Sequence, residues 1–81
     1  MKAFEISATI VYVPLEGGFW GIEADNGAQW LPLDMPAGLK KAGLRAVLRL
    51  RERDDVMTLH LWGSPVRILS YQIVEGVSML S

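Results

Sequence analysis

The chain has 81 residues, 51% of them hydrophobic, and a formal net charge of −1. This length allows one domain with a modest core, and the hydrophobic content excludes a disordered chain. Cysteine is absent, which excludes disulfides and thiolate chemistry, and the small net charge excludes a strong overall attraction to nucleic acid or membranes.

The segment from Phe4 to Val13 is predicted to form a long first strand. Its side chains alternate with a period of two, and it is rich in β-branched residues. One face of its first half is polar, whereas its second half is apolar on both faces. We therefore expect the far end to be covered on both sides, and Pro14 to end the strand or to mark an edge.

Two glycine-containing turns frame the second predicted strand, Phe19 to Asp25. Tandem glycines in Glu16-Gly17-Gly18 supply the positive φ of the first turn, and Asp25-Asn26-Gly27 is the strongest hairpin signal in the chain. Gly21 inside the strand predicts a bulge or a close approach of another group to the backbone.

Prolines and glycines interrupt the chain that follows. Ala28 to Leu33 is predicted to be a short third strand, in which Pro32 marks an edge or ends the pairing. The segment from Asp34 to Gly43 allows one helical turn around Leu39-Lys40-Lys41, but no helix of ordinary length.

The stretch from Leu44 to Trp62 is predicted to be a β-hairpin that turns at Asp54-Asp55, with strands Leu44–Arg53 and Val56–Trp62. On one face this register pairs Arg53 with Val56, Arg51 with Thr58, Arg49 with His60 and Val47 with Trp62. The other face is a predicted core face made of Leu48, Leu50, Met57, Leu59 and Leu61.

A last strand is predicted from Val66 to Val74, with alternate residues from Val66 through Ile68, Ser70 and Gln72 to Val74 on one face. We expect one β-barrel domain over residues 1–76 and a C-terminal tail over 77–81. Short strands with regularly spaced turns predict an all-β fold: a small closed or partly open barrel of five to six antiparallel strands. An OB-like barrel is favoured, with an SH3-like barrel as the competitor.

Basic residues are concentrated in one part of the sequence. Six of the eight lie between Lys40 and Arg53, whereas the first 39 residues carry Lys2 against five carboxylates. A nearly neutral protein can thus have a basic side, which is either a solvated strand face or a binding surface. The candidate ligand-binding residues are Arg45, Arg49, Arg51, His60, Trp62, Trp20 and Trp30.

The aromatic candidates leave two interpretations open. His60 is either a polar strand residue or an anion donor that the neighbouring Arg49 keeps neutral. At least one of the three tryptophans is expected in the core, and one of Phe19 and Trp20 is expected to face outward. Exposed tryptophans beside arginine suit stacking of bases or sugars, and otherwise they cap the barrel or form a contact between copies.

Catalysis and metal binding have little support. One histidine and no cysteine leave only carboxylates to complete a metal site. Nothing places His60 and Ser64 within bonding distance for a catalytic triad, and no glycine-rich phosphate loop opens a helix. We therefore expect a protein that is not an enzyme and that has no metal and no cofactor.

Several short motifs together resemble a group of small uncharacterised bacterial domains with a GG(F/Y)xGI, PLxLP and HxWGxPV pattern. The residues that carry the resemblance are Gly17-Gly18-Phe19-Trp20-Gly21-Ile22, Leu31-Pro32-Leu33-Asp34-Met35-Pro36, Gly43-Leu44 and His60-Leu61-Trp62-Gly63-Ser64-Pro65-Val66. The resemblance implies a small β-barrel and no particular activity. Some members are similar to lipoproteins, from which this chain differs because it has no lipidation cysteine.

Two functions follow as hypotheses. The first is a non-catalytic binding or protein-interaction module, in which the basic and aromatic face meets an acidic partner or a second copy of the chain. The alternative is OB-type binding of single-stranded nucleic acid, with the phosphates on the arginines and the bases on Trp20 or Trp30. No signal peptide and no apolar run long enough for a membrane span is evident, so a cytoplasmic location is expected, and export stays open.

Overall fold

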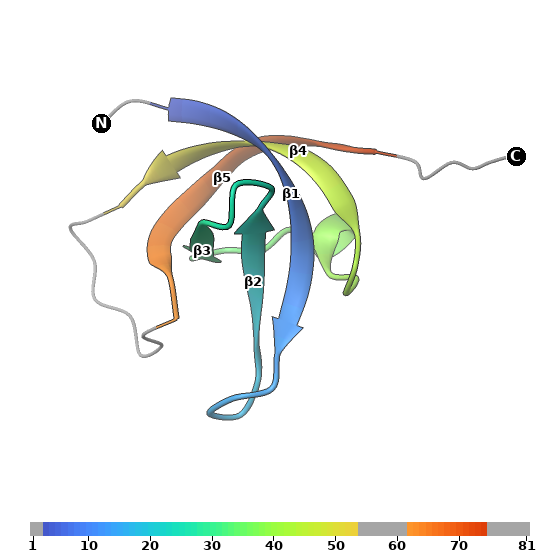
Figure 1. The fold of residues 1–81 in the computed structure, drawn as a ribbon, viewed down its shortest axis with the longest axis vertical. Coiled ribbons are helices and arrows are strands. Elements are labelled where there is room, and N and C mark those ends of the chain that lie inside the picture. Colours follow the sequence, from blue (N-terminus) through green and yellow to red (C-terminus); the bar gives the residue numbers. More distant parts are fainter. Residues whose placement is uncertain (1–2, 54–61, 75–81) are drawn as a thin grey trace, which may run out of the picture.

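The computed structural model describes residues 3–53 and 62–74, which form a small all-β domain (Figure 1). Its elements are β1 (Ala3–Val13), β2 (Phe19–Ala24), β3 (Gln29–Pro32), the 3-10 turn η1 (Ala37–Leu39), β4 (Arg45–Glu52) and β5 (Ser64–Ile73). The five strands close into a ring in the order β1-β2-β3-β5-β4. The all-β class is confirmed. The connector before β4 holds one helical turn, as expected, but at Ala37–Leu39 rather than around Leu39-Lys40-Lys41.

Strand β1 is long enough to pair with two neighbours, and it curves across the molecule as it does so (Figure 1). Its first part, Ala3 to Thr9, pairs with β4, and its second part, Ala8 to Val13, pairs with β2. Both pairings are antiparallel. The expected alternation holds as far as the buried Ile10, but Val13 rather than Tyr12 is buried at the far end.

The turns around β2 follow the sequence signals. Gly17, Gly18 and Gly27 all have φ near +90°, the left-handed region in which a side chain is strained. Between β2 and β3, the Gly27 N–H donates to the Ala24 carbonyl, and the Ala28 N–H donates to the Asn26 side chain at 3.0 Å. The predicted Asp25-Asn26-Gly27 hairpin is thus confirmed.

The ring closes through a parallel pair of strands, so the expected all-antiparallel arrangement is wrong. Trp30, Leu31 and Pro32 of β3 lie beside Ser64, Pro65 and Val66 of β5. Ladder pairing of β3 ends at Pro32, as expected, because proline has no N–H to donate. One more bond, from the Leu33 N–H to the Val66 carbonyl, continues the contact.

Strand β4 does not form the predicted hairpin with Val56–Trp62. Its two edges are taken by β1 and by β5, so that Val47 lies opposite Ser7 and Gln72 rather than opposite Trp62. Trp62 lies in a bend before β5. Residues 54–61, which include the predicted Asp54-Asp55 turn and His60, lie outside the described residues. The alternation within β4 itself is confirmed, with Leu48 and Leu50 buried and Arg49 and Arg51 exposed.

Strand β5 contains an irregularity that the period-two pattern did not predict. Leu50 lies opposite Ile68 but Arg49 lies opposite Ser70, which leaves Leu69 as an extra residue, a β-bulge. Beyond it, Leu48 lies opposite Tyr71 and Ala46 opposite Ile73. The prediction that Ser70, Gln72 and Val74 share a face with Val66 is therefore wrong, because the bulge shifts the alternation by one residue.

The core lies inside the ring. Every strand except β3 contributes fully buried residues to it. It consists of Ala8, Ile10, Ile22, Leu39, Ala46, Leu48, Leu50 and Val66. Leu39 brings the connector into this cluster, and no buried side chain of the described residues is polar or charged. Hydrophobic burial therefore holds the ring together.

Replacing Leu48 tests this core. Leu48→Ala removes a side chain with 0% exposure, and we expect it to lower the free energy of unfolding by about 2–5 kcal/mol through lost burial and a residual cavity. Urea denaturation measures the loss. The matched control is Leu15→Ala, at a leucine that is 57% exposed; it should change the same quantity by less than about 0.5 kcal/mol. Equal effects of the two substitutions would contradict this packing.

Candidate basic surface

Arginines gather on the outer face of the β4–β5 ladder. Arg49 and Arg51 are exposed because they alternate with the buried leucines of β4. The pairing of β4 with β5 sets Arg67 directly opposite Arg51. We name Arg49, Arg51 and Arg67 the arginine surface.

Few opposing charges surround the arginine surface. On the β1 side Arg49 lies opposite Glu5, and Arg51 lies opposite Ala3. On the β5 side Arg49 lies opposite Ser70. Within the described residues, none of the three guanidinium groups forms an ion pair. They are therefore available to a carboxylate or phosphate from outside, since all three are exposed.

Arg67 was not among the residues that the sequence singled out. The predicted hairpin gives β4 a partner other than β5, and the basic cluster in the sequence ends at Arg53. A signal was present: Arg67 stands in a predicted strand between Val66 and Ile68, where its side chain must lie on the face opposite to theirs.

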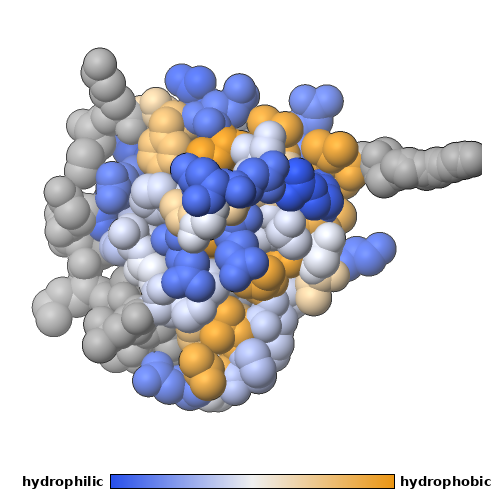
Figure 2. Space-filling view, in the orientation of Figure 1, coloured by the Kyte–Doolittle hydropathy of each residue, from blue (hydrophilic) through white to orange (hydrophobic). Residues whose placement is uncertain are grey.

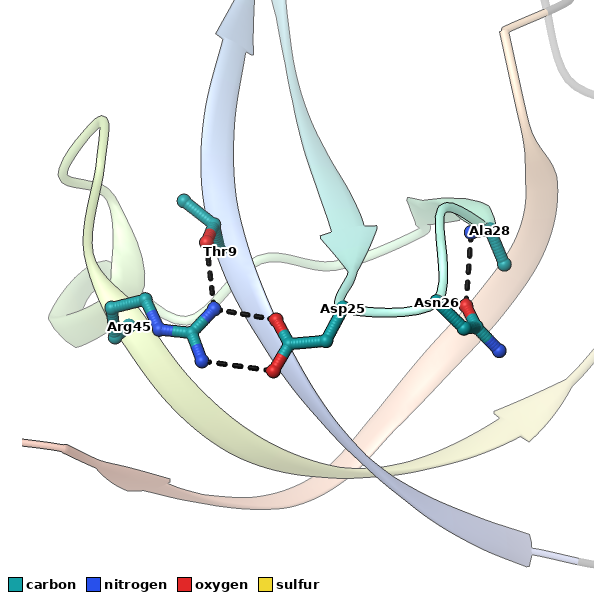
Figure 3. Close-up of polar contacts among 5 residues, drawn as sticks. All are labelled: Thr9, Asp25, Asn26, Ala28 and Arg45. Atoms are coloured by element: carbon teal, nitrogen blue, oxygen red, sulfur yellow. Dashed lines mark hydrogen bonds and ion pairs between the residues drawn. The ribbon is translucent and has the colours of Figure 1, made fainter.

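Arg45 belongs to a different arrangement, although it is also on the outer face of β4. Its guanidinium donates to both carboxylate oxygens of Asp25, at 2.6 and 2.9 Å, and to the Thr9 hydroxyl at 3.0 Å (Figure 3). The contact ties the β2–β3 turn to the start of β4 across β1. Arg45 thus makes a structural contact here, because both of its terminal nitrogens donate within the chain.

The same contact perturbs the acidity of Asp25. The hydrogen bonds from Arg45, together with the positive charge of its guanidinium, hold the pKa of the Asp25 carboxyl below its ordinary value of 3.8. Beside this residue lies an open hollow of about 220 Å³, lined by Ile6, Ser7, Ala24, Asp25 and Asn26. Its single charged group is the carboxylate that Arg45 already holds, so the hollow offers no free charge to a ligand.

The predicted tryptophan candidates do not join the arginine surface. Trp20 and Trp30 are half-buried and pack against the core from β2 and β3. Trp20 meets Tyr12 edge to face at 5.2 Å between ring centroids, and Trp30 meets Phe4 at 5.1 Å. Both rings therefore pack against the core rather than standing free on the surface.

Trp62 covers the outer side of β2. Its ring lies 6.0 Å from that of Phe19, and a Cβ added to Gly21 would fall 2.4 Å from the indole. The expected close approach at Gly21 is confirmed, and the approaching group is this tryptophan. Trp62 thus anchors the start of β5 to β2.

Other classes of site find no support in the described part of the chain. No group of three or more histidine, cysteine, aspartate or glutamate side chains in 3–53 and 62–74 is placed to hold a metal ion. None of the described helical segments has the length and hydropathy to cross a membrane. The candidate His60 lies outside the described residues.

Comparison with protein-family models, with curated proteins and with solved structures finds no match to this chain. The resemblance to small bacterial barrel domains stays a prediction. The function has to be argued from the residues themselves.

The ion pair of Arg45 with Asp25 predicts a pH dependence of stability. Because the folded pKa of Asp25 lies below the unfolded one, its contribution is complete above about pH 5 and is lost as the pH falls through 4 and below. We expect the difference in free energy of unfolding between the wild type and Asp25→Asn to be constant from pH 5 to 7 and to shrink at lower pH. Urea titrations between about pH 2.5 and 7 measure it. A difference that does not change with pH would contradict the contact.

The packing of Trp62 on Gly21 predicts the effect of a single methyl group. Gly21→Ala should displace the indole and cost about 1–3 kcal/mol of stability, as overpacking does. Cross-peaks between the Trp62 indole and the Phe19 ring in nuclear Overhauser spectra should disappear. Persistence of these cross-peaks at unchanged stability would show that Trp62 does not lie on Gly21.

Proposed function

We propose that the protein is a non-catalytic binding module whose arginine surface binds an acidic, extended segment of a partner protein. The observation that carries this proposal is the pairing of Arg51 with Arg67. Like charges directly opposite each other on neighbouring strands are destabilising, and no carboxylate of the described residues forms an ion pair with either. An acidic partner would relieve this repulsion.

The spacing of the arginines supports an extended partner. Residues two apart on a strand are separated by about 6.6 Å, and neighbouring strands by about 4.8 Å. Arg49 and Arg51 therefore repeat with the period of alternate side chains in an extended peptide. Carboxylates at every second position of such a peptide would meet them in turn, and arginine binds carboxylates through two parallel hydrogen bonds.

Single-stranded nucleic acid is the second candidate. It is favoured by the strand ring, since closure by a parallel pair suits a Greek-key, OB-like barrel better than an SH3-like one, and OB-folds bind oligonucleotides on the face of strands 2 and 3. In this chain β2 and β3 carry Glu23 and no lysine or arginine. Trp20 and Trp30 pack inward, so the stacking on which such binding relies has no platform beside the arginines.

Nuclear magnetic resonance titration distinguishes the two candidates. The labelled protein is titrated at low salt with a short polyglutamate peptide and, separately, with a poly-pyrimidine DNA. We expect the peptide to shift the amide signals of Arg49, Arg51 and Arg67, with an apparent affinity that falls as salt is added. Stronger binding of DNA, with shifts at the tryptophan indoles, would favour the nucleic-acid function instead.

Charge variants test the assignment of the surface. Arg51→Ala should weaken peptide binding by about 3- to 10-fold. Arg51→Lys should recover part of the loss, because lysine keeps the charge but cannot form two parallel hydrogen bonds to one carboxylate. Lys40→Ala, in the exposed connector, removes the same charge elsewhere and should leave the affinity unchanged. No shift of any signal at millimolar peptide, or equal effects of Arg51→Ala and Lys40→Ala, would overturn the proposal.

A further inference from the structure

One edge of β5 is unpaired over most of its length. The parallel contact with β3 reaches only Val66, while the antiparallel contact with β4 continues to Ile73. Beyond Val66, no ladder of the described residues lies on the second edge of β5. An unpaired edge presents a row of N–H and C=O groups to any strand that can approach.

The polar backbone groups on this edge can be assigned to residues. The Val74 N–H donates to the Arg45 carbonyl at 2.9 Å, towards β4. Alternate residues of an antiparallel strand direct their N–H and C=O to the same neighbour. Ser70 and Gln72 therefore share the direction of Val74, whereas Tyr71 and Ile73 direct their backbone groups to the unpaired edge.

Exposed apolar side chains alternate with Ser70 and Gln72 along this edge, and the Tyr71 hydroxyl lies next to Gly38 of η1. Leu69, Tyr71, Ile73 and Val74 are 39, 41, 37 and 47% exposed. Figure 2 shows hydrophobic surface beside the point where the described chain ends, next to the grey atoms. The stretch Ile68–Val74 has no charge, proline or glycine, the residues that usually protect an edge strand.

We infer that this edge is a contact between two copies of the chain, which pair antiparallel through β5 about a two-fold axis at Tyr71. In this register Tyr71 lies opposite its own copy, and Leu69 lies opposite Ile73. Ser70 lies opposite Gln72, and Ile68 opposite Val74. Apolar residues thus meet apolar residues and polar ones meet polar ones, which an isologous contact requires of a single sequence.

The hydrogen bonding agrees with the same register. Tyr71 and Ile73 are the residues whose backbone groups are directed to the free edge. Tyr71 stands at a hydrogen-bonded position opposite its own copy, whereas Ile73 lies opposite Leu69, the bulge residue. A second copy fits this neutral edge better than the acidic partner of the arginine surface, which lies on the outer face of the ladder.

Sedimentation velocity of the wild-type chain tests the inference. One strand pair is smaller than a standard interface, so we expect a dimer with Kd on the order of 100 µM, visible as a mass that rises with concentration. Ile73→Lys places a charge on the free edge, and Tyr71→Pro removes an N–H from it. Each substitution should weaken association at least about tenfold. Leu15→Lys, at another exposed leucine, should leave it unchanged.

Amide hydrogen exchange of the wild type gives a second readout that needs no variant. The Tyr71 and Ile73 amides should gain protection as the concentration rises, whereas those of Ser70 and Gln72, already directed to β4, should not. A wild-type mass that stays monomeric to about 1 mM would overturn the inference. So would association that Ile73→Lys and Tyr71→Pro leave unchanged, or protection gained equally by all four amides.

Discussion

Three alanines in one row determine how this small ring closes. Ala8 of β1 lies opposite Ala24 of β2 on one edge and opposite Ala46 of β4 on the other, and all three are buried. At this row β1 changes its partner from β4 to β2. Side chains that fill little space allow the backbones of the three strands to approach closely at this point, while the larger Ile10, Ile22 and Leu48 fill the interior beside them.

The two faces of the β4–β5 ladder follow from this closure. With both edges of β4 occupied, its leucines are fixed toward the core and its arginines toward solvent. Because of the bulge at Leu69, Tyr71 and Ile73 lie opposite the buried Leu48 and Ala46, on the inner side of the ladder. Both side chains are nevertheless exposed, since they lie near the end of β5. The outer face is therefore charged, and the free edge is neutral and apolar. These are surfaces for two different kinds of partner.

Local patterns in the sequence were sufficient for much of the fold. The period of two in β1 and β4, the turn at Asp25-Asn26-Gly27 and the close approach at Gly21 each depend on the conformation of a few neighbouring residues. The pairing of β4 depended instead on a choice between a local partner after Asp54-Asp55 and a more distant one. Because Arg67 lies on that distant partner, the sequence predicted only Arg49 and Arg51 of the arginine surface. It also predicted Arg45, whose guanidinium forms an ion pair with Asp25.

The register of β4 against β5 is the claim on which both surfaces depend, and cross-strand nuclear Overhauser effects measure it directly. In the labelled wild-type protein we predict contacts between the backbone protons of Arg51 and Arg67 and between those of Leu48 and Tyr71. These contacts would establish the like-charged pair and the side on which Tyr71 lies. Contacts of Arg51 with Thr58, and of Val47 with Trp62, would instead establish the local hairpin and contradict the account.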